Sequence, residues 1–436
     1  MKKKVLIITY YWPPSGGGGV QRWLKFVKYL RQFDWDPVVF TPENPEMPAE
    51  DTSMMKDIPK DLLVIKNKIW EPYGFYKKFT GKKRNEKIQT AFLTERKNSP
   101  RMLENISVWV RGNFFIPDAR KFWIKPSVRQ LSQWLKEHPV DVIVTTGPPH
   151  SVHLIGLKLH RKLNIPWLAD FRDPWTNIDF YDQLKLSRYA DKKHHRLEQD
   201  VLTSASAVTI VSPGMDSDFK KIVDRDYVVI PNGFDRDDLK LKHPVEPDRK
   251  HFTLSHIGSL TKTRNADNLW KVLGELVHED EDLDRQLVLK NVGKIDVHAV
   301  DSITKHGVDK YLQRVDYIPH EEVIAEQQKA SVLLLLINNT PNAHLVLTGK
   351  IFEYLASGRP IICIGPVWGN AAEIVRQTKC GKAFGFEEIK ELKAEIKRLF
   401  LAHQKGQEVG DCVGVDQYDR KNLTEKLAGV LNEISS

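Results

Sequence analysis

Short apolar runs alternate with amphipathic, helix-length segments along most of this 436-residue chain. The runs are rich in β-branched residues, whereas the segments between them repeat apolar side chains at helical spacing. Parallel strands need a long crossover connection, which is usually a helix, so this alternation predicts parallel pairing. The sequence therefore predicts an α/β protein whose sheets are covered by helices on both faces.

The alternation falls into two series, separated by the charged, proline-containing stretch LKLKHPVEPDRKH. The first series predicts strands at residues 4–9, 36–41, 140–147, 166–171, 207–212 and 227–230. The second series predicts strands at residues 252–258, 285–293, 330–337 and 359–365. We therefore expect two doubly wound domains, at residues 1–238 and 250–414, and a helix at 415–436 that packs back on the first domain.

The positive charge is concentrated in one stretch of the first domain. Residues 68–125 hold fourteen Lys and Arg against five Asp and Glu, an excess equal to the net charge of +9 of the whole chain. Aromatic side chains are interleaved with these charges, which suits contact with anionic lipid headgroups or phosphates. The alternative is a solvated insertion with a few core aromatics.

Several features bear on the compartment. No apolar run reaches the ~18 residues that span a bilayer, and the apolar run after Met1-Lys2-Lys3-Lys4 is too short for a signal peptide. Cys363, Cys380 and Cys412 are widely spaced and form no C-x-x-C pair. We expect a cytoplasmic protein with reduced cysteines and no disulfide framework.

Four consecutive glycines, Gly16 to Gly19, follow the first predicted strand and precede a helix. Ligands of open parallel sheets bind beyond the carboxyl ends of the strands, where helix N-termini offer free N–H groups to anions. Glycine also lets the main chain approach a ligand closely. The run does not match G-x-G-x-x-G, so dinucleotide binding is a weak interpretation, and a merely flexible loop is the alternative.

Two further strand ends of the first domain carry polar side chains. In TTGPPHSVH, His150 lies at a predicted helix start and His153 in the first turn of that helix. A structural role fits His153 better than His150. The pair offers only two ligands, which argues against a metal site. In ADFRDPW, the residues Asp170, Arg172 and Asp173 either form a structural ion pair or bind an acceptor.

In the second domain, HIGSLTKTRN carries Gly258 and then Lys262 and Arg264 from a strand end into a helix start. Two cations beside helix N–H groups suit a diphosphate. Solvated lysines are the alternative, and the segment NAHLVLTGKIFEYLASGRPII decides against it.

With that segment, the chain resembles glycosyltransferase family 4 and, more generally, GT-B glycosyltransferases that use nucleotide-diphosphate sugars. The matching pieces are the glycine loop, TTGPPH, DFRDPW, VSPGM, PNGFD, HIGSL and TGKIFEYLASGRPII, in this order. The resemblance implies two Rossmann-like domains facing one another across a cleft. The carboxyl-terminal domain would hold the nucleotide-sugar.

The resemblance also implies roles for single residues. Glu353 would accept hydrogen bonds from the ribose hydroxyls, Lys350, Lys262 or Arg264 would neutralise the diphosphate, and the glycine loop would close over the phosphates. His150 would lie near the transferred sugar. The expected catalytic residues are thus His150 and Glu353, and Asp170, Arg172 and Asp173 are the expected acceptor-binding residues. The expected donor-binding residues are Gly17, Gly18, Gly19, Gly258, Ser259, Lys262, Arg264, Gly349, Lys350, Ile351 and Glu353.

The chain departs from the family pattern at two positions. Leu345 replaces a common Glu, so contacts to the donor sugar must differ, and Ser259 replaces an Arg that often binds phosphate. The phosphate role then shifts to Lys262, Arg264 or Lys350. No metal or other cofactor is expected, since Asp235-Arg236-Asp237 lies in the turn at the domain boundary and GT-B sites use protein cations.

These features predict a retaining hexosyl- or N-acetylhexosaminyl-transferase of surface-polysaccharide assembly. Its partners would be a nucleotide-sugar, a glycan or lipid-linked acceptor and the anionic inner face of the cell membrane. A nucleotide-sugar epimerase of the same fold is the alternative enzyme. A basic nucleic-acid-binding protein ranks lower, because no recognition helix, stacking platform or zinc module accompanies the charge.

Overall fold

The computed structural model describes residues 2–47, 50–71, 101–178, 181–240, 245–246, 248–316, 318–407, 409–410 and 412–436. The chain divides into two compact units. Met1–Pro231 and Lys421–Ser436 form the first, here the amino domain, and Asn232–Arg420 form the second, the carboxyl domain. The residues from Lys421 onward, within the helix expected at 415–436, thus belong to the first unit.

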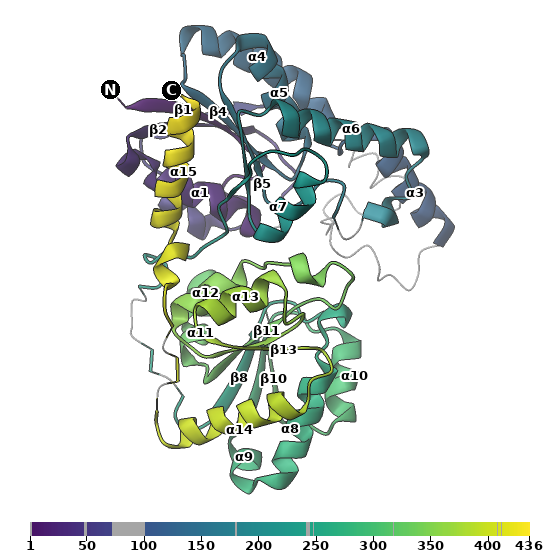
Figure 1. Cartoon of the computed structure of the whole chain (residues 1–436), viewed down its shortest axis with the longest axis vertical. Helices are drawn as coiled ribbons and strands as arrows, with labels where there is room; N and C mark the ends of the chain where they lie inside the picture. The colour runs from purple at the N-terminus through teal and green to yellow at the C-terminus, as the bar shows by residue number, and fades with distance from the viewer. Residues whose placement is uncertain are drawn as a thin grey trace. The chain divides into compact units, whose positions relative to one another are not determined.

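The amino domain is built on a seven-stranded parallel sheet in the order β3-β2-β1-β4-β5-β6-β7 (Figure 1). Its strands are β1 (Lys3–Ile8), β2 (Trp35–Pro42), β3 (Leu63–Asn67), β4 (Val142–Gly147), β5 (Trp167–Phe171), β6 (Ala207–Ile210) and β7 (Val228–Val229). The order reverses between β1 and β4, which pair from Val5 opposite Val142 to Ile8 opposite Thr145. Such a reversal is where open α/β sheets bind ligands.

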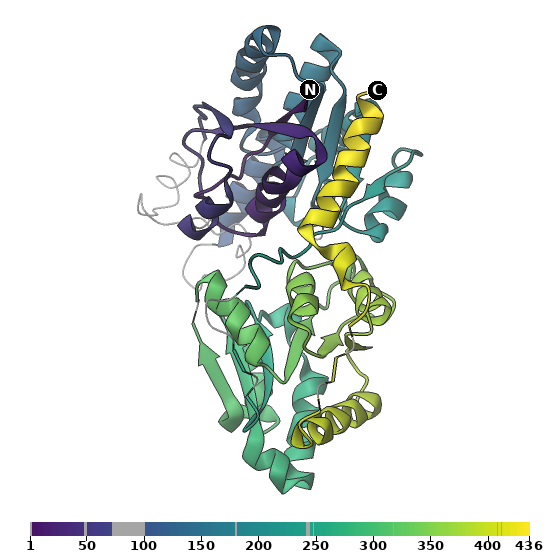
Figure 2. The same ribbon diagram turned by 90° about the vertical axis from the view of Figure 1, so that its left-hand side faces the viewer.

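Helices cover both faces of this sheet. The larger helices are α1 (Gly18–Leu30), α3 (Arg101–Phe114), α4 (Lys121–Glu137), α5 (Ser151–Leu163), α6 (Arg188–Ser204), α7 (Pro213–Lys220) and α15 (Arg420–Ile434). One core joins the sheet to α4, α5, α6 and α7, and the other joins it to α1 and α15. Figures 1 and 2 show α15 lying alongside α1.

The carboxyl domain contains a six-stranded parallel sheet in the order β10-β9-β8-β11-β12-β13. Its strands are β8 (Phe252–Ile257), β9 (Leu287–Val292), β10 (Leu312–Val315), β11 (Val332–Leu336), β12 (Ile361–Ile364) and β13 (Gly381–Phe384). Its α-helices are α8 (Asp267–Glu279), α9 (Glu281–Gln286), α10 (Val297–Lys305), α11 (His320–Lys329), α12 (Lys350–Ser357), α13 (Asn370–Gln377) and α14 (Lys390–Gln404). Cores on the two faces involve α8, α10 and α14 on one side, and α12 and α13 on the other. Both domains are thus Rossmann-like.

Short 3₁₀ turns complete the described elements. They are η1 (Arg31–Phe33), η2 (Thr52–Asp57), η3 (Tyr181–Leu184), η4 (Lys262–Arg264), η5 (Asp309–Tyr311), η6 (Ala343–Leu345) and η7 (Val415–Tyr418). Among the residues that the structure describes, no helix has the length and the apolar character needed to span a bilayer.

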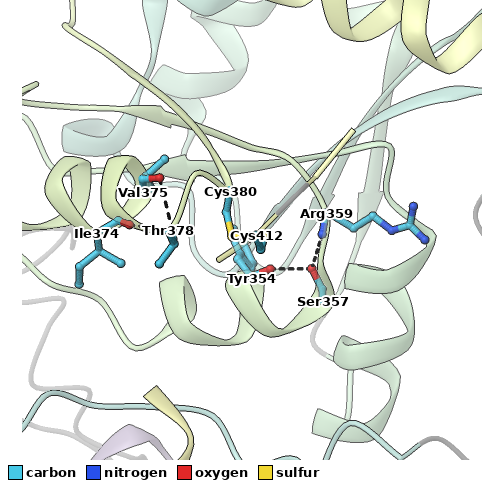
Figure 3. Close-up of a disulfide and its surroundings, with 8 residues drawn as sticks. All are labelled: Tyr354, Ser357, Arg359, Ile374, Val375, Thr378, Cys380 and Cys412. Atoms are coloured by element: carbon cyan, nitrogen blue, oxygen red, sulfur yellow. Dashed lines mark hydrogen bonds between the residues drawn. A yellow bond between two sulfur atoms is a disulfide. The ribbon is translucent and has the colours of Figure 1, made fainter. Parts of the chain in front are cut away.

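The expected reduced state of all three cysteines is wrong. Cys380 and Cys412 form a disulfide in the carboxyl domain, with their Cα atoms 4.6 Å apart (Figure 3). The two residues are 32 positions apart, and the intervening α14 turns the chain back so that the Val413 N–H donates to the Thr378 carbonyl. Only tertiary structure brings them together, so spacing alone gave no sign of the bond. Cys363 is free and buried, and burial raises the pKa of its thiol to about 12.

The predicted basic aromatic insertion is described only in part. Residues 72–100, with Tyr73, Phe75, Tyr76 and Phe79, lie outside the described residues. Residues 101–125 form α3 and the start of α4. Trp123 belongs to the core, where its ring stacks on Phe40, whereas Trp70, Trp109, Phe114 and Phe122 are exposed.

Candidate functional site

In the carboxyl domain, Gly258 directly follows the last residue of β8, and the side chain of Lys350 lies against this glycine. Gly258 has φ +118°, and a Cβ atom added there would come 2.3 Å from the Lys350 Nζ. Only glycine tolerates both the backbone conformation and the contact. Gly258, which the sequence predicts to lie beside a phosphate, therefore leaves space for the side chain of Lys350, the first residue of α12.

Lys350 and Arg264 form a pair of neighbouring cations. Burial first, and then the positive charge of Arg264, lower the pKa of Lys350 to about 7, although Glu353 acts in the opposite direction. Burial also lowers the pKa of Arg264. Among the described residues, neither cation forms an ion pair with a carboxylate. An anion placed between them would remove the repulsion and replace the lost hydration.

The Arg264 guanidinium is held in place by neutral acceptors. Its Nε donates to Asn338 Oδ1 at 2.5 Å, and its Nη1 donates to the Ser259 carbonyl at 3.2 Å. Asn338 follows β11, so the arginine is fixed across the β8–β11 reversal of the sheet order. This arrangement orients a charge without neutralising it.

Glu353 lies one turn after Lys350 on α12 and is half-buried. Its carboxylate accepts a hydrogen bond of 3.0 Å from the Nε2 of Gln327, a residue of α11 that the sequence analysis missed. His256, at the end of β8, was also missed. Burial, with Lys350 nearby, lowers the pKa of His256 to about 3, so its imidazole is neutral at physiological pH.

The other predicted donor-binding residues differ in what they can offer. Lys262 is exposed, Ser259 is half-buried, and Gly349 is the exposed N-cap of α12. Ile351 is fully buried in the core, so only its main chain can face a ligand. Glycines 17–19 lie in the amino domain.

In the amino domain, the glycine loop lies against Arg172. Gly17 caps α1 with φ +102°, and the first turn of α1 holds no acidic residue. A Cβ atom at Gly19 would come 2.3 Å from the Arg172 Nη1. The loop glycines therefore leave space for a guanidinium beside the positive end of a helix dipole.

Arg172 and Asp170 do not form the structural ion pair that their proximity in sequence suggested. Asp170 is fully buried and pairs with Arg22, whose Nη2 donates to its carboxylate at 2.8 Å. Trp23, Thr146 and Thr209 also donate to this carboxylate. Burial alone would raise the pKa of Asp170, but Arg22 and the hydrogen bonds outweigh it and lower the value to about 2. Because these four residues already donate to the Asp170 carboxylate, a structural role is favoured over acceptor binding for this residue.

The two remaining acceptor candidates are placed differently. Arg172 donates through Nε to the Gly147 carbonyl at 3.2 Å and through Nη2 to the Pro148 carbonyl, and burial lowers its pKa. Asp173 is exposed. Arg172 thus links the β5 end to the turn that carries His150.

His150 is held by aromatic packing. Its ring stacks on the Trp175 indole with centroids 4.8 Å apart and an interplanar angle of 7°, and only 9% of the residue is exposed. Burial, and then the neighbouring His153, Arg172 and His194, lower the pKa of His150 well below its usual value. The imidazole is therefore neutral, and its Nδ1 is buried without a described hydrogen-bond partner.

His153 has the structural role that its sequence position favoured. It is fully buried, its Nδ1 forms a 2.9 Å hydrogen bond with the Thr145 hydroxyl, and burial lowers its pKa to about 3. The N-terminus of α5 is not open to an anion, since the Ser151 N–H donates to the Asp118 carboxylate at 2.9 Å.

Comparisons with known proteins bear on the family and the fold of this chain. Residues 17–233 match the family model of the glycosyl transferase 4-like domain. A comparison with curated protein sequences found no match.

Solved structures share the fold over the whole chain. Anabaena HepE in complex with UDP-glucose has a TM-score of 0.59 at 16% identity, covering 99% of this chain and 100% of that chain. Sucrose-phosphate synthase from Thermosynechococcus elongatus has a TM-score of 0.58 at 13% identity, with 99% of both chains covered. WaaG, a glycosyltransferase involved in lipopolysaccharide biosynthesis, has a TM-score of 0.55 at 14% identity, covering 98% of this chain and 99% of that chain.

Proposed function

We propose that this chain, which has the GT-B fold and whose residues 17–233 match the model of the glycosyl transferase 4-like domain, transfers a hexosyl or N-acetylhexosaminyl group from a nucleotide-diphosphate donor. One observation carries the donor assignment. Lys350 and Arg264 are neighbouring cations without a described carboxylate partner, and Glu353 lies one helical turn away. A nucleoside diphosphate supplies the anion for the cations and the hydroxyl donors for the carboxylate.

In the proposed reaction, the bond between the anomeric carbon and the diphosphate oxygen breaks while the acceptor hydroxyl oxygen attacks from the same face. The departing diphosphate takes the bonding electrons and the acceptor's proton, so configuration is retained. Lys350 and Arg264 stabilise the charge that grows on the leaving group, which lowers the barrier more than it stabilises the bound donor. His150, as a neutral imidazole, keeps the role beside the transferred sugar that the family resemblance implies.

We further propose a lipid-linked or glycan acceptor of surface-polysaccharide assembly at the cytoplasmic face of the membrane. An aromatic patch supports it, formed around Lys121 by the exposed Trp70, Trp109, Phe114 and Phe122 and the half-buried Phe115. The Lys121 Nζ lies 5.4 Å from the Phe115 ring centroid and 5.1 Å from that of Phe122. Aromatic rings mixed with a cation suit the interface of an anionic bilayer.

The donor assignment is tested by calorimetric titration with UDP, GDP and TDP and their common sugar derivatives. We expect one of these nucleotides to bind, and Lys350→Met to weaken binding on the order of 100-fold through loss of a charged hydrogen bond. Lys271→Met, at an exposed lysine of the same domain, is the control and keeps the affinity. Absence of binding by the whole panel would reject the proposal.

The transferase assignment is tested by radiolabelled sugar transfer from the bound donor to a bacterial membrane extract. Label in the lipid or glycan fraction is expected. Conversion of the nucleotide-sugar without any added acceptor would instead favour the epimerase alternative.

A further inference from the structure

Gln327 is a buried amide whose orientation is determined by one neighbour. Only 1% of the residue is exposed, and its Nε2 donates to the Glu353 Oε2 at 3.0 Å. A carboxylate only accepts hydrogen bonds, so the NH₂ end of the amide must face it. The Gln327 Oε1 is then left buried, without a described hydrogen-bond partner.

Leaving a buried acceptor without a donor costs about 1–3 kcal/mol, so the amide is not accounted for by packing alone. Leucine of similar size would fill the same space without that cost. The compensating interaction is the hydrogen bond to Glu353, which joins α11 to α12. A buried glutamine has lost its rotamer freedom, so it holds its partner in one position.

The consequence for Glu353 is a carboxylate whose orientation is fixed by a neutral donor. Within the described chain, Gln327 is the only hydrogen-bond donor to this carboxylate, and it binds Oε2, so Oε1 accepts none. A lysine or arginine in place of Gln327 would neutralise the group. A neutral amide instead orients it and leaves its capacity for other donors intact.

We propose that Gln327 is a positioning residue that fixes the Glu353 carboxylate to receive the ribose hydroxyls of a nucleoside diphosphate, and thereby sets the discrimination between ribose and deoxyribose. This inference rests on the proposed function, because it deepens the same donor site. Gln327 itself need not touch the nucleotide. Its effect is confined to the sugar end of the ligand, whereas Lys350 and Arg264 act on the diphosphate.

The test compares the affinity of the full-length protein for UDP with that for 2′-deoxyUDP and 3′-deoxyUDP, and likewise for GDP and its two deoxy forms. In the wild type we expect removal of a ribose hydroxyl to weaken binding about tenfold or more. In Gln327→Leu this deoxy penalty falls to about threefold or less, while binding of inorganic diphosphate is unchanged. Gln328→Leu makes the same change at the next position of α11 and keeps the wild-type penalty.

A second variant covers the case in which Gln327→Leu does not fold. Gln327→Glu places two carboxylates together, so at neutral pH it should bind more weakly than the wild type, and it should approach the wild-type affinity measured at the same pH as the pH falls to about 5, where one group is protonated and donates as the amide does. A merely structural glutamine would change thermal stability without altering the deoxy penalty or creating this pH dependence.

The outcomes separate this inference from the proposed function. If the wild type binds none of UDP, GDP and TDP, both fail together. If it binds only TDP, which lacks the 2′-hydroxyl, the discrimination between ribose and deoxyribose is overturned while the donor assignment stands. If it binds but shows no deoxy penalty, or if Gln327→Leu keeps the full penalty and Gln327→Glu shows no recovery at low pH, the positioning role is overturned while the donor assignment stands.

Discussion

At the residue scale, Lys350 shows how the fold changes the chemistry of one side chain. Its ammonium group is buried beside Arg264, and its pKa of about 7 leaves it only partly protonated in a neutral solution. A diphosphate would provide the missing opposite charge and favour the protonated form. Ligand binding and proton uptake at this lysine are therefore linked.

The first prediction follows from this linkage. Affinity for the bound nucleotide-sugar, whose diphosphate does not titrate near neutrality, should fall as the pH rises from about 6 to about 8.5, because above its pKa Lys350 must first take up a proton. Calorimetry in two buffers of different ionisation enthalpy measures that uptake directly. Lys350→Met should remove the pH dependence, and a flat profile in the wild type would contradict the prediction.

The second prediction concerns His150. His150→Ala should lower kcat on the order of 100-fold, as for loss of one hydrogen-bond donor to a transition state, with little change in nucleotide affinity. Because the pKa of His150 lies well below its usual value, the imidazole stays neutral, and the wild-type rate should show no titration near pH 6.5. Steady-state kinetics across the pH range, with calorimetry on the variant, check both statements. A large loss of nucleotide affinity would place His150 at the donor instead.

Single residues also show which parts of the site could be predicted from the sequence. The resemblance drew attention to Lys350, Arg264 and Glu353, which the structure does bring together in one domain. Gln327 and the Arg22–Asp170 pair could not be anticipated, because their partners are 26 and 148 positions away. Such contacts depend on how helices pack on a sheet, which local patterns do not encode.

At the element scale, the ten predicted strands are present, and three more were missed. The missed strands β3, β10 and β13 lie at sheet edges and are only partly buried. A strand at the edge of a sheet pairs with a neighbour on one side only and is less buried than a central strand. It therefore needs no continuous apolar run, and its sequence resembles that of a loop. Central strands such as β11, with the sequence VLLLL, are buried on both faces and were easily recognised.

The third prediction belongs to α3 and the start of α4. Replacing Trp109 and Phe114 of the aromatic patch with serine should weaken binding to phosphatidylglycerol-containing vesicles about tenfold, since less apolar surface enters the interface. Both residues are exposed, at 43% and 59%, so stability should change little. Co-sedimentation measures the effect. Trp368→Ser, at an exposed tryptophan of the carboxyl domain, is the matched control. Equal binding by all three proteins would exclude the patch.

The fourth prediction concerns the segment that the disulfide attaches to the start of β13. Cys412→Ser should lower the free energy of unfolding of the carboxyl domain by about 3 kcal/mol, because the unfolded chain regains the freedom of a 32-residue loop. Urea denaturation with and without a reductant measures this loss. Reduced wild type should match the variant. Detection of three alkylatable thiols in unreduced, unfolded protein would show that the bond is absent.

At the scale of the whole molecule, the amino domain is formed by two separate stretches of the chain, Met1–Pro231 and Lys421–Ser436. Apolar residues of α15, among them Leu423, Leu427 and Leu431, pack in the same core as Val5 and Ile7 of β1. Residues far apart in the chain thus complete one hydrophobic face. The sequence predicted this return from the apolar stripe of the helix, and its partners became visible only in the structure.

The fifth prediction tests that dependence. Leu427→Ala should destabilise the amino domain by about 2–4 kcal/mol, the cost of a cavity at a buried leucine. Fluorescence of the buried Trp23 and Trp35, which share this core, should report an earlier urea transition. Leu401→Ala, at a leucine of α14 that is 53% exposed, should leave the transition unchanged. An unaltered midpoint in Leu427→Ala would mean that α15 contributes little to this core.

The position of α15 also sets an order of events during biosynthesis. When Met1–Pro231 have emerged from the ribosome, α15, which together with α1 covers one face of their sheet, has not yet been synthesised. The entire carboxyl domain is translated in between. The nascent amino domain must therefore wait with apolar surface uncovered, and it is at this stage that a chaperone would bind it. The amino domain is therefore the first to be translated but the second to complete its hydrophobic core.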